Sequence, residues 1–362
     1  MLLVKIIVNE IKLIQSLAQV GKTLQKNNVC NIFFVHGTFV GNDPFGMSWV
    51  LDDIWVPSWV TENLRNLKKN FTDTSLSNLS NFTEGYKDVF SAGINSALQN
   101  NKQIACMNFQ WDSQNNHIGR LKAATGLVAQ MARVISASED SKILLIGHSH
   151  AGQVFALITL FLEQGERANN LIDCLGEIIS QQELDSFHTN LKKIENAHLD
   201  IVTLGTPVRY PWGVYKKYRL LNIVNHRSDV YLNGLLFTRD GDYVQHWGIE
   251  GTDTIPVDDN YPDLFEKLDK NLDKGLLDAE SLHKIRSVHK RRTHVDSKGN
   301  EVGINLFVDY QDQGPRVILL KFPPWLIGKP NCIETVFGHG FYTLEKNMLP
   351  NIKIIIKNLY NE

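Results

Sequence analysis

Runs rich in apolar and β-branched residues alternate along the chain with longer segments in which apolar residues recur every three or four positions. The first five runs are almost continuously apolar, which is typical of strands covered on both faces. The runs that predict strands are Asn31–Val35, Gln103–Asn108, Lys142–Ile146, Asp200–Leu204, Leu220–Val224, Gly303–Tyr310 and Arg316–Phe322. The segments that predict helices are Val60–Lys69, His117–Ser138, Gly152–Gln164, Gln182–Ile194 and Thr343–Leu359. This alternation favours an α/β fold with a mostly parallel central sheet and helices on both faces.

Three segments interrupt this alternation or enlarge it. Residues 258–298 are charged and polar with helical stretches, and they predict an insertion on the sheet. Residues 45–70 and 207–220 are rich in aromatic residues and follow predicted strands, so they are candidate lid or pocket loops at the carboxyl edge of the sheet. Within these loops Trp55, Trp59 and Trp212 are candidate substrate-binding residues, and ordinary core packing is the alternative role for them.

The 362 residues include 37 basic and 39 acidic side chains, for a net charge of −2, which disfavours a nucleic-acid partner. The four cysteines form no Cys-x-x-Cys pair and the histidines form no metal-binding helix motif, so we predict neither a metal nor a cofactor. The amino terminus lacks the features of a signal peptide, and the longest apolar stretch is about half of the ~20 residues that cross a bilayer. We therefore expect a cytoplasmic protein without a transmembrane segment; signal-independent secretion and transient membrane contact stay open.

The strand predicted at Lys142–Ile146 leads into Gly147-His148-Ser149-His150-Ala151, and a long apolar helix follows. A Gly-x-Ser-x-small sequence between a strand and a helix is typical of a sharp turn that exposes a nucleophilic serine at the sheet edge. The residues two before and two after the serine crowd each other in such a turn, and Gly147 and Ala151 are both small. Ser149 is therefore the predicted nucleophile. A role as helix N-cap would explain Ser149 but not its two small neighbours.

Together with two further segments, this turn resembles the α/β-hydrolase superfamily, and within it the lipase- and esterase-like serine hydrolases. Asn31–Val35 ends in His36-Gly37, which is similar to the oxyanion loop of that family, and Asp200–Pro207 is similar to the strand after the serine turn. The resemblance implies one α/β-hydrolase domain over residues 1–362 with inserted lid or cap segments. It also implies that the backbone N–H of Thr38 is one oxyanion donor. The N–H of His150, directly after the nucleophile, is the expected second donor.

A serine nucleophile needs a histidine base and a carboxylate that orients it, and in this family they follow in the order Ser, Asp or Glu, His. Asp229 lies just beyond the strand predicted at Leu220–Val224 and is the predicted acid. Turn formation is its alternative role, and Asp240 and Asp309 are weaker substitutes. His339, between Gly338 and Gly340 near the closing helix, is the predicted base. His246 is its rival because it lies nearer to Asp229 in the sequence.

The resemblance and these residues predict a hydrolase for carboxylic esters that acts through an acyl-enzyme on a small-molecule or lipid ester. An acyltransferase or thioesterase with the same triad is an alternative, since other acceptors use the same nucleophile. A binding or effector module that has lost activity is an alternative from a different class. The cluster Lys216, Lys217 and Arg219 either meets a charged headgroup or belongs to a solvated face. The oligomeric state is not predicted.

Overall fold

A computed structural model describes most of the sheet and the helices that cover it. The described residues are 2–37, 84–114, 116–135, 141–206, 210, 212–214, 216–225, 229–232, 235–238, 262–273, 316–320, 339–340 and 342–360. The strand predicted at Gly303–Tyr310 and the helix predicted at Val60–Lys69 lie outside these residues.

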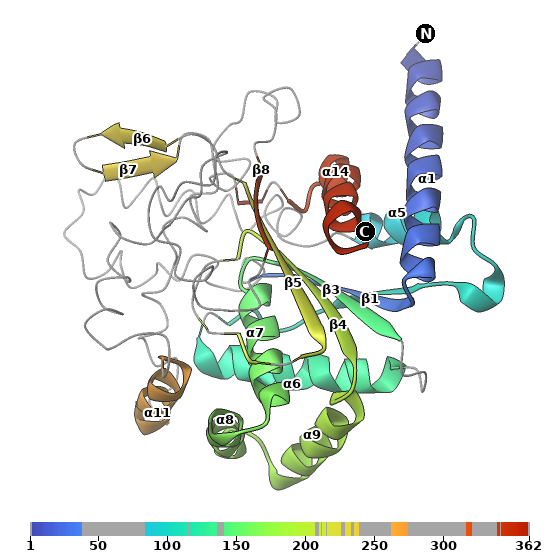
Figure 1. Ribbon diagram of the computed structural model, residues 1–362. Helices are drawn as coiled ribbons and strands as arrows, with labels where there is room; N and C mark the ends of the chain where they lie inside the picture. The colour runs from blue at the N-terminus through green and yellow to red at the C-terminus, as the bar shows by residue number, and fades with distance from the viewer. Residues whose placement is uncertain are drawn as a thin grey trace.

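Within the described part of the chain, six parallel strands form a central sheet in the order β2-β1-β3-β4-β5-β8 (Figure 1). The strands are β1 (Val29–Val35), β2 (Ala105–Phe109), β3 (Lys142–His148), β4 (His198–Leu204), β5 (Tyr218–Asn225) and β8 (Arg316–Leu320). The prediction of an α/β fold with a mostly parallel sheet is confirmed. A separate antiparallel hairpin, which the sequence did not predict, consists of β6 (Asp229–Leu232) and β7 (Leu235–Thr238).

Alternate residues of the strands supply two hydrophobic cores, one on each face of the sheet. In β3, Ile143 and Leu145 belong to one core, and Leu144 and Ile146 belong to the other. Because successive side chains of a strand point to opposite faces, only a continuous apolar run can fill both cores. The molecule therefore has three layers, with helices on either side of the sheet (Figure 1).

The helices fall into two groups according to the core that they complete. On one face lie α6 (His117–Val134), α7 (Ala151–Glu163), α8 (Glu166–Gly176), α9 (Gln181–Ile194) and α11 (Pro262–Asp273). On the other face lie α1 (Leu2–Lys26), α5 (Glu84–Asn95), α14 (Glu345–Ile355) and the π-helical turn η5 (Ile356–Tyr360). A short 3-10 turn, η3 (Asn100–Lys102), precedes β2. None of the described helices combines the length and the apolar composition that crossing a membrane requires.

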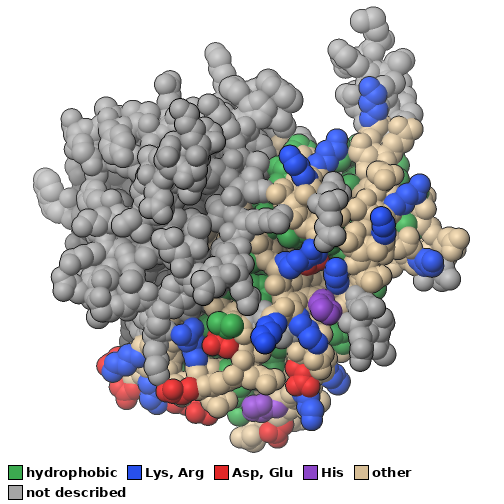
Figure 2. Space-filling model, viewed as in Figure 1, with side chains coloured by type: hydrophobic (Ala, Val, Ile, Leu, Met, Phe, Trp, Pro, Cys, Tyr) green, Lys and Arg blue, Asp and Glu red, His purple; other side chains and the backbone are tan. Residues whose placement is uncertain are grey.

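Helix α11 lies within the insertion predicted at 258–298 and belongs to the same core as the sheet. Leu264, Leu268 and Leu272 on one side of the helix are buried in that core. On its outer side, Lys267 forms an ion pair with Glu177 at the end of α8, with 2.8 Å between Nζ and Oε1. Helices α8 and α11 lie at the bottom of the view in Figure 1, and Figure 2 shows acidic and basic side chains mixed over this part of the described surface, as expected of a solvated face.

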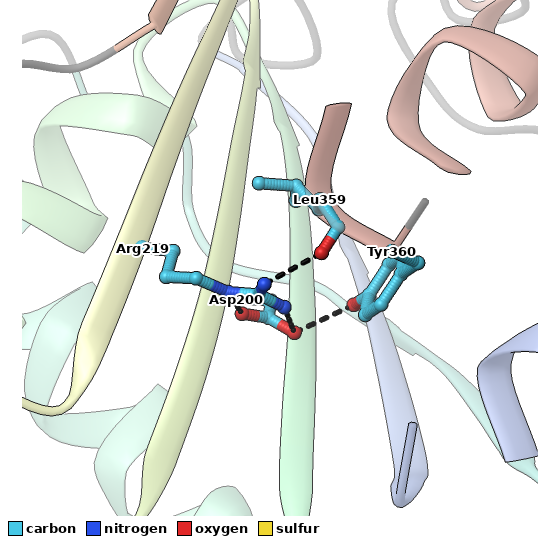
Figure 3. A network of polar contacts seen from close by, with 4 residues as sticks. All are labelled: Asp200, Arg219, Leu359 and Tyr360. Atoms are coloured by element: carbon cyan, nitrogen blue, oxygen red, sulfur yellow. Dashed lines mark hydrogen bonds and ion pairs between the residues drawn. The ribbon is translucent and has the colours of Figure 1, made fainter. Parts of the chain in front are cut away.

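A polar network ties the end of the chain to the middle of the sheet (Figure 3). The buried carboxylate of Asp200 in β4 accepts two hydrogen bonds from Arg219 in β5, at 2.7 and 2.8 Å, and one from the Tyr360 hydroxyl at 2.7 Å. Arg219 also donates to the Leu359 carbonyl. Burial, and then the charge of Asp200, raise the pKa of Tyr360 well above its ordinary value, so the hydroxyl keeps the proton that it donates.

This network also decides the role of the basic cluster that begins with Lys216. Arg219 is the second residue of β5, so the cluster lies at the amino end of that strand, whereas Ser149 follows the carboxyl end of β3. Lys217 donates from Nζ to Asn196 just before β4. The idea that the cluster meets a substrate headgroup beside Ser149 is therefore wrong, because parallel strands place these residues at the opposite edge.

Candidate active site

The predicted nucleophile and the predicted oxyanion loop lie side by side at the point where the strand order reverses. After β1 the chain adds β2 on one side, and it then crosses β1 to add β3 and β4 on the other side. Val35 at the end of β1 is therefore a direct neighbour of Gly147 in β3. In open α/β sheets, ligands bind outside the carboxyl ends of the strands at such a switch point.

Ser149 stands on the sharp turn between β3 and α7 with a backbone conformation that serine rarely adopts. Its φ angle is 55°, in the left-handed region, which costs roughly 1–2 kcal/mol for a residue with a Cβ atom. Hydrogen bonds on both sides of the residue hold this conformation. The Ser149 N–H donates to the Leu204 carbonyl at 2.9 Å, and the Thr206 hydroxyl donates to the Ser149 carbonyl at 2.7 Å.

The small residues around Ser149 are required by contacts, as the sequence predicts. A Cβ atom on Gly147 would lie 2.4 Å from a ring carbon of Phe155 and 3.0 Å from the Cβ of Ala151. A Cβ atom on Gly152 would lie 2.3 Å from the hydroxyl oxygen of Thr206. The strand, the helix and the segment after β4 thus meet at distances that admit no side chain at these glycines.

We expect Ser149→Gly to be more stable than Ser149→Ala by about 1 kcal/mol, because glycine adopts a positive φ angle without the penalty that alanine retains. Midpoints of chemical denaturation for the two variants measure the difference. Ser186 in the regular helix α9 is the matched control: there the alanine variant should be more stable than the glycine variant. A Ser149→Ala variant at least as stable as Ser149→Gly contradicts the left-handed conformation.

Gly37, directly after β1 and His36, contacts the side chain of Ser149. A Cβ atom on Gly37 would lie 2.4 Å from the Ser149 Cβ, 2.9 Å from the His148 carbonyl oxygen and 3.1 Å from the Ser149 hydroxyl oxygen. The residues predicted as nucleophile and oxyanion loop are therefore in direct contact, although they are more than 100 positions apart in the sequence.

His36 braces this loop from the side. Its Nε2 accepts the backbone N–H of Trp111 at 3.3 Å, and its Nδ1–H therefore donates to the Gly37 carbonyl at 2.8 Å. The Ser113 hydroxyl donates to the same carbonyl at 3.2 Å. Burial lowers the pKa of His36, and the hydrogen bond to Gly37 only partly opposes this effect. A neutral ring with both nitrogens engaged fits a bracing role for His36, and it leaves no nitrogen for acid–base chemistry.

The Ser149 hydroxyl itself is fully buried and has no hydrogen-bond partner among the described residues. His150, the expected second oxyanion donor, is buried and immediately precedes α7, the helix that follows the turn. The amino end of a helix carries a partial positive charge, which favours an anion at this place.

His339 is buried at the same edge of the sheet, beside the residue that precedes Ser149. The Nε2–H of His148 donates to the His339 carbonyl at 2.8 Å, and the two imidazole centroids are 4.6 Å apart. The structure thus brings His339 next to the Ser149 turn from a position almost 200 residues away. No hydrogen bond joins His339 to the Ser149 hydroxyl.

The other predicted site residues are described in part or not at all. Asp229 is the first residue of β6, four positions beyond the end of β5, and its backbone pairs with Thr238. Its side chain is not among those described, so its role stays a prediction. The predicted or alternative residues outside the described part of the chain are Thr38, Trp55, Trp59, Asp240, His246 and Asp309.

Trp212 lies in the core rather than in an open pocket. Only 6% of its surface is exposed, and its ring stacks on Tyr218 with the centroids 6.4 Å apart. The next residue, Gly213, donates its N–H to the Thr159 hydroxyl, about 12 Å along α7 from the start of that helix. These contacts are those of a core aromatic, the alternative role considered for Trp212. The predicted loop 207–220 also ends early, because β5 begins at Tyr218.

Sequence reasoning missed several residues that support the site. Thr206 and Ser113 hold the carbonyls of Ser149 and Gly37, and His148 holds that of His339. Nothing in the sequence indicates which backbone group each of these side chains would bind. Among the described residues, no group of three or more histidine, cysteine or acidic side chains is placed to hold a metal ion.

We compared the chain with models of protein families, with curated proteins and with solved structures, and found no match in any of the three comparisons.

Proposed function

We propose that this chain is a serine hydrolase with an α/β-hydrolase fold that cleaves carboxylic esters of the lipase or esterase type. Ser149 is the nucleophile, His339 the base, and Asp229 the carboxylate that orients the base. The backbone N–H groups of Thr38 and His150 bind the oxyanion. The reaction needs no cofactor, since the serine supplies the attacking atom.

The observation that carries the proposal is the conformation and surroundings of Ser149. Ser149 has a φ angle of 55° on the turn between a central parallel strand and a helix, a conformation that costs free energy for a residue with a Cβ atom. In this position the side chain sits at the carboxyl edge of the sheet, directly against Gly37. Strain at such a position is typical of a nucleophile held out for attack.

The strand order supports the proposed fold class. The serine turn follows β3, and the strands after it, β4 and β5, extend the sheet on one side. The glycine loop follows β1, the neighbour of β3 on the other side. In an α/β-hydrolase fold the nucleophile turn and the oxyanion loop come from neighbouring strands in this way, so that both reach one carbonyl group.

In the proposed reaction the Ser149 oxygen attacks the ester carbonyl carbon while His339 takes the hydroxyl proton. The carbonyl oxygen becomes negative and accepts hydrogen bonds from the two backbone N–H groups. The carbonyl re-forms as the carbon–oxygen bond to the alcohol breaks, and His339 gives its proton to the departing alcohol. Water then attacks the acyl-enzyme and loses a proton to His339. As the bond between the acyl carbon and the Ser149 oxygen breaks, His339 returns this proton to that oxygen, and the acid leaves. The Ser149–His339 hydrogen bond would form when substrate binds, since such bonds often tighten only in the complex.

The test is covalent labelling with a fluorophosphonate probe, combined with rates of hydrolysis on short- and long-chain nitrophenyl esters. Wild type should be labelled at Ser149, located by peptide mapping, and should release nitrophenol. Ser149→Ala should do neither. Ser141→Ala is the matched control, because Ser141 is also buried but precedes the opposite end of β3, and it should behave as wild type.

Each alternative gives a different result in the same experiment. A wild-type protein that ignores the probe and all esters contradicts the enzyme proposal and favours a binding module. Labelling at Ser149 with transfer of the acyl group to an added alcohol, or with a strong preference for thioesters, identifies an acyltransferase or a thioesterase instead.

A further inference from the structure

We propose that His148 is a positioning residue that holds the base His339 beside the nucleophile. This inference rests on the proposed function and deepens it, because it assigns a role to a histidine that ends β3 directly before Ser149 but does not itself react. Three sets of contacts carry it.

The first set joins His148 to His339. The imidazole of His148 is fully buried, and its Nε2 lies 2.8 Å from the carbonyl oxygen of His339. A carbonyl accepts only, so Nε2 carries the proton in this contact. The two rings also lie against each other, with the centroids 4.6 Å apart. His148 therefore fixes both the backbone and the ring of His339.

The second set joins both histidines to Tyr342 and, through it, to helix α14. The Tyr342 ring is fully buried and contacts both imidazoles, with centroids 5.7 Å from His148 and 6.4 Å from His339. Asn351 in α14 donates to the Tyr342 carbonyl at 2.9 Å. His339, His148 and Tyr342 therefore form one buried cluster, which ties the base both to the sheet and to α14.

The third set joins His148 to the reacting centre. His148 is the last residue of β3 and is bonded directly to Ser149, whose backbone is held by Leu204 and Thr206. The nucleophile and the residue that holds the base are therefore neighbours in the chain. Loss of this contact would remove a direct tie between His339 and the residue that precedes Ser149. An error of about 1 Å in the placement of the base can cost about 100-fold in rate.

The test compares two replacements of His148 that differ in the ability to donate a hydrogen bond. His148→Phe keeps a flat ring but has no N–H, and we expect kcat to fall about 100-fold with KM within about twofold of wild type. His148→Gln keeps an N–H at the end of a side chain of similar length, and its kcat should lie within about fivefold of wild type. His148→Leu replaces His148→Phe if the larger ring prevents folding.

A control separates positioning from a loss of stability. Arg219→Met removes the ion pair with Asp200 at the other end of the sheet, so it should lower the melting temperature without changing kcat. Equal kcat values in His148→Phe and His148→Gln overturn the inference, as does a kcat for His148→Phe equal to that of wild type. In either case an active wild type, labelled at Ser149, leaves the proposed function standing. A wild type that is neither labelled nor active overturns both proposals.

Discussion

Replacement of His339 by alanine is expected to lower kcat for ester hydrolysis by about 10⁴-fold or more while leaving the protein folded. The serine hydroxyl is a weak nucleophile at neutral pH and needs a base to remove its proton. The structure places His339 beside the Ser149 turn, through its contacts with His148. Steady-state rates on the best nitrophenyl ester, with the rate of fluorophosphonate labelling, measure the effect.

His246→Ala is the matched variant for this prediction, since sequence position alone makes His246 the rival base. It should retain a kcat close to that of wild type. If His246→Ala is the inactive variant and His339→Ala stays active, the base has been assigned to the wrong histidine. The melting temperature of His339→Ala must also be recorded, because His339 is fully buried and its loss leaves a cavity.

The sheet could be predicted from the sequence because its strands are almost entirely apolar. A run such as Lys142–Ile146 supplies side chains to the cores on both faces of the sheet. An apolar residue is therefore needed at almost every position, and such a run is recognisable in the sequence. The helices α1 and α5 were missed although their buried residues follow helical spacing. Leu17, Val20 and Leu24 are buried in α1, and Tyr86, Phe90 and Ile94 are buried in α5.

In the candidate site, too, the features set by local sequence could be predicted, whereas the contacts between distant segments could not. Ser149 can be predicted as a candidate nucleophile because a sharp turn imposes small residues two positions away on either side, which is a local constraint. The contact of Gly37 with Ser149 and that of His148 with His339 depend instead on which strands become neighbours. Strand order is set by the packing of the whole chain, and no short segment records it. The hydrogen bond from Tyr360 to Asp200 likewise joins residues that are 160 positions apart in the sequence.

Replacement of Gly37 by alanine is expected to lower kcat by about 10²- to 10³-fold. This is the usual effect of losing an oxyanion donor, which here is the N–H of the next residue, Thr38. The new methyl group would lie 2.4 Å from the Ser149 Cβ and 2.9 Å from the His148 carbonyl oxygen, where no carbon atom fits. The loop or the serine must therefore move. His36 and Ser113 hold the Gly37 carbonyl from the other side, so that a shift strains these hydrogen bonds as well. Rates of ester hydrolysis and of probe labelling measure the loss.

Gly126→Ala is the matched control for the same chemical change. Gly126 lies inside α6, and an added methyl group would come no closer than 3.4 Å to its nearest neighbour, a ring carbon of Phe109. Alanine favours a helix over glycine by up to about 1 kcal/mol, so this variant should be as active as wild type and at least as stable. If Gly37→Ala were as active as Gly126→Ala, the loop after β1 would not border the reacting carbonyl. The N–H group of Thr38, which follows Gly37, would then not be an oxyanion donor, and the donor would have to come from another segment.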